Sequence, residues 1–163
     1  MRTSTLVAGF ALAGLAGLAG AQSPTPADIR HGRYLIQISG CNDCHTSGYM
    51  QKEGKIAEAE WLTGDSMGWQ GDWGTTYPAN LRLVMQKLDE KAWLTRARQP
   101  MRPPMPSPSL HAMTDADLKA IYHYIRSLGP KGRPAPAYVP PGARVSTPYF
   151  DITPKNLPKQ AAK

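Results

Sequence analysis

The stretch Cys41-Asn42-Asp43-Cys44-His45 decides the fold of this chain. Two thiols separated by two residues match the spacing of the two vinyl groups of a haem, to which they add as thioethers. The imidazole of the histidine that follows directly is then carried to the iron as an axial ligand. The stretch therefore predicts one covalently attached haem c, bound through Cys41 and Cys44 and ligated by His45.

Three other interpretations of the two cysteines compete with haem attachment. A thioredoxin-like thiol–disulfide pair is expected within a βαβ pattern, which the surrounding sequence lacks. A zinc site requires further ligands, but the chain has 2 cysteines and no second Cys or His pair at metal spacing. A structural disulfide closing so short a loop removes little entropy from the unfolded chain.

The first 21 residues have the anatomy of a secretory signal peptide. Arg2 provides a positive start, Leu6 to Gly20 is an uncharged Leu/Ala/Gly stretch, and small residues precede a cleavage point after Ala21. Fifteen such residues are short for a membrane span, so a retained anchor is the weaker alternative. We therefore expect export to the bacterial periplasm, the compartment in which haem is joined to this motif.

The mature chain is basic. Removing residues 1–21 takes away only Arg2 and leaves 18 Lys and Arg against 12 Asp and Glu. Export and the absence of a run of five basic residues argue against nucleic acid as a partner. A basic surface can instead steer an acidic redox protein, or at most a peripheral membrane contact, into encounter. The residues proposed from charge alone to ring the exposed haem edge are Lys52, Lys55, Arg96 and Arg98.

Helical patterns flank the motif on both sides. A first helix is expected from an N-cap at Asp28 to about Ser39, with Gly32 on its apolar side suggesting close approach of another helix. A second is expected from Asp89 to about Arg98. The third and strongest opens with Thr114-Asp115-Ala116-Asp117, which resembles a capping box, and ends at Gly129-Pro130.

The segments between and after these helices are irregular in pattern. Residues 61–80 combine three tryptophans and a tyrosine with glycines, which suits a wall for a flat ligand better than a helix or strand. Residues 100–108 contain five prolines and predict a stiff extended loop. Residues 130–163 contain eight prolines, and we expect this extension to lie over the domain surface or to remain mobile.

Taken in order, these features resemble the class I c-type cytochromes, and more narrowly the small periplasmic monohaem cytochromes of proteobacteria. The phrases that carry the resemblance are Cys-Asn-Asp-Cys-His-Thr, Trp-Gly-Thr-Thr-Tyr-Pro-Ala-Asn-Leu and Met-Thr-Asp-Ala-Asp-Leu-Lys-Ala-Ile-Tyr. The resemblance covers roughly residues 28–129 and implies an all-α cytochrome c fold around one haem. We assign the cytochrome domain to residues 22–129 and a Pro-rich C-terminal extension to residues 130–163. The resemblance also implies that the first and last helices cross, with Gly32 against an aromatic residue near Tyr124.

Two departures from the family concern the support of His45. Such proteins often have proline where Ser47 and Asp72 stand here, and a carbonyl near the second of these positions orients the proximal imidazole. The partner of His45 Nδ1 is therefore an open question at this stage.

The sixth ligand is expected to be a methionine, because a His/Met pair raises the haem potential and suits electron transfer. Met105 lies between two prolines, where the resemblance places the ligand of the Met-Pro loop, and Met101 is the next candidate. Any single methionine can also be flexible core filler. The other methionines considered are Met50, Met67, Met85 and Met113, and the histidines that bis-His ligation would require are His31, His111 and His123.

These features favour an electron carrier over an enzyme. We expect a periplasmic monohaem cytochrome that passes single electrons from a dehydrogenase-type donor to a terminal oxidase or reductase. One alternative is a haem protein with an open or labile sixth site, used in ligand sensing or peroxidase-like chemistry. A thiol–disulfide protein, with Cys41 and Cys44 free, is the second alternative.

Overall fold

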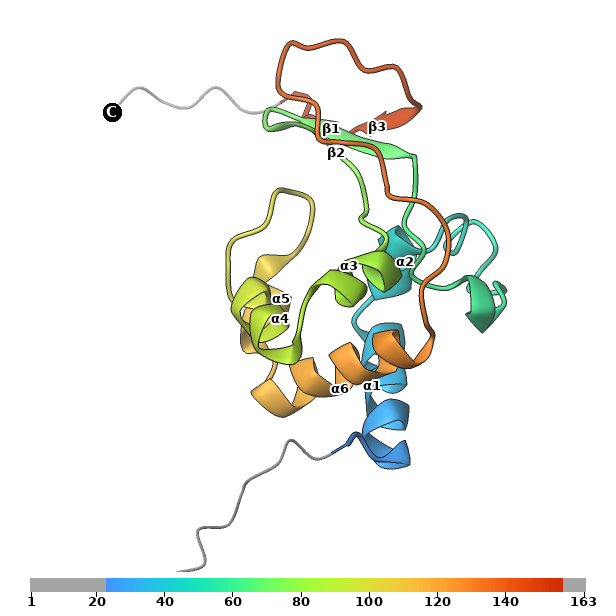
Figure 1. Ribbon diagram of the computed structural model, residues 1–163. Helices are drawn as coiled ribbons and strands as arrows, with labels where there is room; N and C mark the ends of the chain where they lie inside the picture. Colours follow the sequence, from blue (N-terminus) through green and yellow to red (C-terminus); the bar gives the residue numbers. More distant parts are fainter. Residues whose placement is uncertain (1–22, 157–163) are drawn as a thin grey trace, which may run out of the picture.

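Two crossing helices form the centre of the fold, which the computed structural model describes over residues 23–156 (Figure 1). α1 spans Pro26–Ile38 and α6 spans Asp115–Ser127. A Cβ on Gly32 of α1 would lie 2.0 Å from the carbonyl oxygen of Ala120 and 2.8 Å from Cβ of Tyr124. Only glycine permits this approach, so the expected crossing of the first and last helices is confirmed.

Both helices begin with a capping box. Thr114 caps α6 and exchanges hydrogen bonds with Asp117, as the sequence predicts. The prediction of Asp28 as the N-cap of α1 is wrong, because Thr25 is the N-cap and Asp28 occupies the third helical position. There its carboxylate accepts from Thr25 N at 2.8 Å, so Asp28 completes the box from inside the helix.

Four further helical segments complete this part of the fold. The predicted second helix is confirmed, with Asp89 as its N-cap. Three short helices were not expected, and one of them corrects the prediction of an extended loop over residues 100–108. This helix starts at Ser107 and takes Pro108 into its first turn, where a missing N–H costs nothing. The segments are α2 (Cys41–His45), α3 (Leu81–Lys87), α4 (Glu90–Ala97) and α5 (Ser107–Ala112), with a 3₁₀ turn over Glu58–Glu60.

A small sheet lies above the helices in Figure 1. β1 (Gly68–Gly71) and β2 (Gly74–Thr76) form an antiparallel hairpin, and β3 (Tyr149–Asp151) pairs in parallel with β1. The expectation that residues 61–80 form no strand is therefore wrong for this hairpin. Its glycines permit the tight connection that local strand propensity alone does not indicate.

The C-terminal extension runs from the end of α6 up one side of the molecule to this sheet (Figure 1). The amide of Asn80 donates to the carbonyls of Lys131 and Arg133, at 2.7 and 3.1 Å. Farther along, Val139 and Thr75 exchange backbone hydrogen bonds of 3.0 and 2.8 Å. The extension was expected either to lie over the domain surface or to remain mobile. Residues 131–152 lie over the domain.

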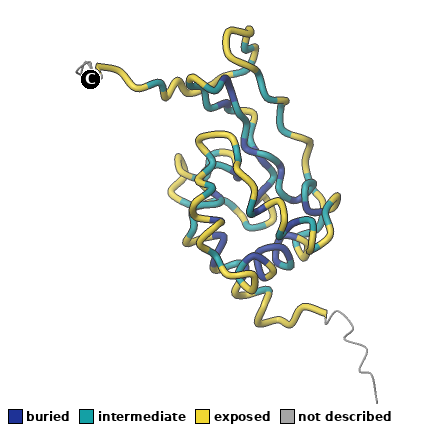
Figure 2. The backbone as a smooth tube through the Cα atoms, turned by 90° about the vertical axis from the view of Figure 1, so that its left-hand side faces the viewer, coloured by how far each residue is buried: buried dark blue, intermediate teal, exposed yellow. Residues whose placement is uncertain are grey.

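The buried core is concentrated where α1, α3, α4 and α6 meet (Figure 2). Arg82 of α3 is only 5 % exposed, and its guanidinium donates to the carbonyls of Ala59, Leu128 and Gly129. Burial lowers the pKa of Arg82, and the three carbonyls supply the acceptors that a buried guanidinium needs. The buried apolar residues are Leu35, Ile36, Trp61, Leu62, Met85, Trp93, Ala97, Leu110, Leu118, Ala120, Ile121, Tyr122, Tyr124 and Ile125.

The predicted signal peptide, residues 1–21, lies outside the described residues. Within residues 23–156, none of the helices has the length and apolar character needed to cross a bilayer.

Substitution Gly32→Ala should destabilise the protein, because the new methyl group would overlap the Ala120 carbonyl of α6. An alanine at an exposed helical site stabilises by about 1 kcal/mol relative to glycine, whereas forcing extra volume into a packed contact costs about 1–3 kcal/mol. Denaturant unfolding of the holoprotein measures the difference, with Tyr34→Ala as a control because Tyr34 is an exposed residue of the same helix. A Gly32→Ala protein as stable as the wild type would contradict the tight crossing.

Candidate functional site

The motif residues Cys41 to His45 form α2, a single short helix that follows α1 almost directly. Gly40 has a φ of 67°, in the left-handed region that glycine tolerates, and this conformation turns the chain from one helix into the next. Cys41 and Cys44 lie three residues apart on α2, so their side chains project from the same face. One group can therefore reach both thiols.

Burial keeps both thiols protonated. It raises the pKa of Cys41 to about 11 and also raises the pKa of Cys44, with the Asp43 carboxylate adding to both shifts. A redox-active Cys-x-x-Cys pair needs a thiolate stabilised by positive charge, and this environment does the reverse. The geometry and electrostatics therefore disfavour the thiol–disulfide alternative.

His45 is buried and held by one backbone carbonyl. Its Nδ1 lies 2.7 Å from the carbonyl oxygen of Ala79. Because a carbonyl only accepts, Nδ1 carries the hydrogen, and Nε2 keeps its lone pair for a metal. Burial also lowers the pKa of His45, although the hydrogen bond to Ala79 opposes this shift. His45 is therefore oriented in the neutral form that ligates iron.

The partner of His45 Nδ1, which the sequence left open, is the Ala79 carbonyl. The carbonyl near Asp72 that the resemblance suggested is not the partner of His45, because Ala79 in the segment leading from β2 to α3 supplies it. Gly64 lies between that segment and the motif, and its N–H donates to the His45 carbonyl at 2.8 Å. A Cβ on Gly64 would lie 2.7 Å from Asn80 N, so a larger residue would force the segment away.

Three buried side-chain polar atoms of the described residues have no hydrogen-bond partner in the protein. They are Nδ2 of Asn42 in the motif, and Nε1 of Trp73 and Oγ1 of Thr75 in the β1–β2 hairpin. An indole N–H is only a donor, so an unpaired one needs an acceptor from elsewhere. A haem carries two propionate carboxylates, which accept such hydrogen bonds, so the orphaned donors fit that group.

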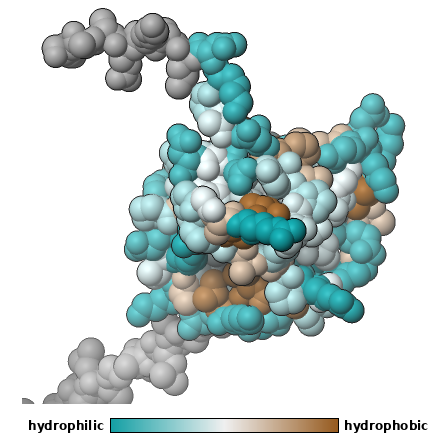
Figure 3. Space-filling model, turned by 90° about the horizontal axis from the view of Figure 1, so that it is seen from above, coloured by the Kyte–Doolittle hydropathy of each residue, from teal (hydrophilic) through white to brown (hydrophobic). Residues whose placement is uncertain are grey.

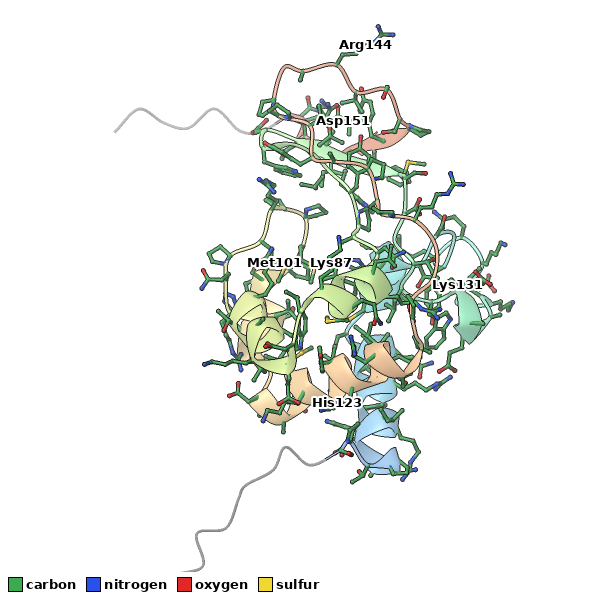
Figure 4. The ribbon with its side chains drawn as sticks, in the orientation of Figure 1. Lys87, Met101, His123, Lys131, Arg144 and Asp151 are labelled. Atoms are coloured by element: carbon green, nitrogen blue, oxygen red, sulfur yellow. The ribbon has the colours of Figure 1, made fainter. Side chains whose placement is uncertain are left out.

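Met101 and Met105 lie in the loop that rises above α4 and α5 (Figure 4). Both are half-buried and pack against the hydrophobic core. The base of the loop is closed by a hydrogen bond from Met101 N to Ser107 Oγ at 2.9 Å, and its tip forms a turn in which Met105 N donates to Arg102 O at 3.2 Å. The structure thus brings both candidate ligands into one loop, and Met85 lies fully buried in the core.

The histidines considered for bis-His ligation have other surroundings. His31 and His123 lie 2.8 Å from the carboxylates of Asp117 and Glu90, respectively. His111 is exposed on α5, and its carbonyl accepts from Arg98. These contacts account for all three without a metal.

The four basic residues expected to form a ring do not gather on one face. Lys52 and Lys55 lie in the loop after α2, whereas Arg96 and Arg98 lie at the end of α4, on the opposite side of the molecule in Figure 1. Lys55 is paired with Glu53 and Arg98 with Asp115. The predicted ring is therefore wrong as a single surface.

A cavity of about 220 Å³ adjoins Cys44. Its lining mixes apolar and polar side chains. The apolar ones include Met50, Met67, Trp69 and Phe150, and the polar ones are Asp43, Ser47, Gln51 and Asp65. Viewed from the sheet side, the surface shows apolar areas interrupted by hydrophilic side chains (Figure 3). The attachment helix is thus reached through an opening that is partly apolar and partly acidic.

Sequence reasoning missed the residues that act through the backbone. Ala79 contributes only its carbonyl, and Gly64 acts through the space it leaves. The sequence singles out the segment from Trp73 to Asn80 as a whole. Which of its atoms faces His45 depends on a contact between distant segments.

Comparison with known proteins agrees with this geometry. The Cytochrome c family model matches residues 29–129, which is more than half of the chain. Searches of curated proteins and of solved structures returned no match. The matched region begins in α1 and ends just after α6, and it includes the Cys-x-x-Cys-His motif and the methionine loop. The chain therefore belongs to the cytochrome c family, whose members carry electrons on a covalently bound haem c.

Proposed function

We propose that this cytochrome is a periplasmic monohaem electron carrier in which His45 and Met105 are the two axial ligands. It would accept single electrons from a dehydrogenase-type donor and deliver them to a terminal oxidase or reductase. The observation that carries the proposal is the buried His45, which the Ala79 carbonyl orients so that Nε2 is free to bind a metal. The methionine loop, residues 98–106 between α4 and α5, packs its two methionines against the hydrophobic core. Bound haem supplies a one-electron Fe(II)/Fe(III) couple.

Each residue of the site has a separate role. Cys41 and Cys44 would hold the porphyrin through thioethers, each made by adding an S–H across a vinyl double bond. Ala79 fixes the tautomer and direction of the His45 ring, as outer partners do at metal sites. Met105 would hold the iron through its thioether, a ligand that favours Fe(II).

Met105 is favoured over Met101 by its position in the loop. It is flanked by Pro104 and Pro106, which restrict the backbone on both sides and lower the entropy lost when the side chain is held. Its carbonyl also accepts from Ser107 N at 2.9 Å, where α5 begins. The helix thus anchors the loop next to Met105.

Compartment and partners follow from the sequence and the surface. The signal-peptide pattern of residues 1–21 supports export to the periplasm. The basic excess of the chain supports an acidic redox partner, although the basic residues are spread rather than gathered. The opening beside Cys44 is the face through which we expect the partner to approach.

Substitution Met105→Ala should open the sixth position of the iron. The ferric protein should lose the weak red band that reports methionine–iron charge transfer, and the ferrous protein should bind carbon monoxide rapidly. Visible spectra of the oxidised, reduced and carbon monoxide-treated holoproteins measure both effects. Met101→Ala is the matched control, because Met101 is a half-buried methionine of the same loop.

If the red band is lost in Met101→Ala and kept in Met105→Ala, the sixth ligand is Met101 and not Met105. Rapid carbon monoxide binding by the wild type would instead support ligand sensing or peroxidase-like chemistry. Absence of covalently bound haem from denatured protein would contradict thioether attachment at Cys41 and Cys44.

Substitution Trp73→Phe tests whether the buried indole N–H donates to the haem. Loss of a hydrogen bond from this donor should lower the stability of the holoprotein by about 1–3 kcal/mol, because its carboxylate partner would be left unpaired. Denaturant unfolding measures this, with Trp69→Phe as the control because the Trp69 N–H is not among the buried unpaired atoms. A Trp73→Phe protein as stable as the wild type, or more so, would mean that the N–H has no acceptor.

A further inference from the structure

The methionine loop is held from outside by two contacts. The Thr76 hydroxyl of β2 donates to the Pro103 carbonyl at 2.6 Å. The Arg102 guanidinium lies over the ring of Tyr138, 4.1 Å from its centroid. Tyr138 belongs to the C-terminal extension, beyond the region matched by the family. The extension therefore contacts the loop that carries Met105.

Tyr138 is itself fixed in place. Its hydroxyl donates to the Trp73 carbonyl at 2.7 Å, and the next residue, Val139, pairs with Thr75 through two backbone hydrogen bonds. Gly74 has a φ of 95°, and a Cβ there would lie 2.3 Å from the Val139 carbonyl oxygen. The hairpin is thus shaped to receive this part of the extension.

The tip of the loop makes one backbone hydrogen bond of its own. Arg102, Pro103 and Pro104 are exposed, and Met105 N donates to the Arg102 carbonyl across the turn that they form. The hydrogen bonds that involve Ser107 lie at the base of the loop. A thioether is a weak ligand on a flexible side chain, so the fraction of time it spends on the iron depends on how its backbone is held. The Arg102–Tyr138 stack restrains the side chain of Arg102, and the carbonyl of the same residue accepts a hydrogen bond from Met105 N.

We infer that Tyr138 is a positioning residue for the sixth ligand: through Arg102 it holds the methionine loop in the conformation that keeps Met105 on the iron. This inference rests on the proposed role of Met105. In this arrangement the extension completes the haem site from outside the family domain. Loss of the stack raises the population with an open sixth position, and it lowers the midpoint potential because the thioether favours Fe(II).

The test is the affinity of the ferric holoprotein for imidazole, which competes with Met105. Tyr138→Ala and Arg102→Ala should each bind imidazole about three- to tenfold more tightly than the wild type, with a lower midpoint potential. The double variant should match either single variant, since both remove the same contact. Tyr138→Phe retains an aromatic face and should remain within about twofold of the wild type.

Tyr149→Ala is the matched control, because Tyr149 is an exposed tyrosine of the same extension that pairs with β1. It should leave imidazole binding unchanged. Arg102 is exposed, so its substitution tests the stack even if Tyr138→Ala weakens the packing of the extension.

Two failures are distinguishable. Wild-type imidazole affinity in both Arg102→Ala and Tyr138→Ala, together with tight binding by Met105→Ala, would overturn the positioning role and leave the ligand assignment intact. Wild-type affinity in Met105→Ala would overturn the ligand assignment and, with it, this inference.

Discussion

The hydrogen bond from His45 Nδ1 to the Ala79 carbonyl is the contact on which the site depends. It joins the attachment helix to the segment between the hairpin and α3, so the orientation of the imidazole is set by the path of a distant piece of backbone. The neighbouring Asn80 caps α3 with its side-chain oxygen and binds the C-terminal extension with its amide nitrogen. Motif, hairpin, helix and extension are thus linked through two consecutive residues.

Structural features that depend on residues close together in the sequence could be predicted. The Cys-x-x-Cys-His motif, the cap at Asp89 and the box at Thr114 each depend on side chains within one helical turn. Gly32 was also informative, because a glycine inside a helix has few explanations other than close packing. The cap of α1 was misplaced because a threonine three residues earlier outcompetes an aspartate that also suits the box.

Features that depend on tertiary pairing could not be predicted. β1 and β2 are short and rich in glycine, and β3 is a piece of a Pro-rich tail, so none has the alternation that marks a strand. The Ala79 carbonyl has no side-chain signature at all. The supposed basic ring failed for the same reason, since proximity along the sequence says nothing about which face a charge occupies.

The parallel pairing of β3 with β1 has a consequence for the order in which the molecule is assembled. The motif lies early in the chain, and α1 and α2 are built from contacts between near neighbours. The extension, in contrast, must close a long loop before it gains any contact with the hairpin, and such pairing is slow. Phe150 of β3 lines the cavity beside Cys44. The topology therefore makes one wall of the opening beside Cys44 from a strand that must pair across a long stretch of chain.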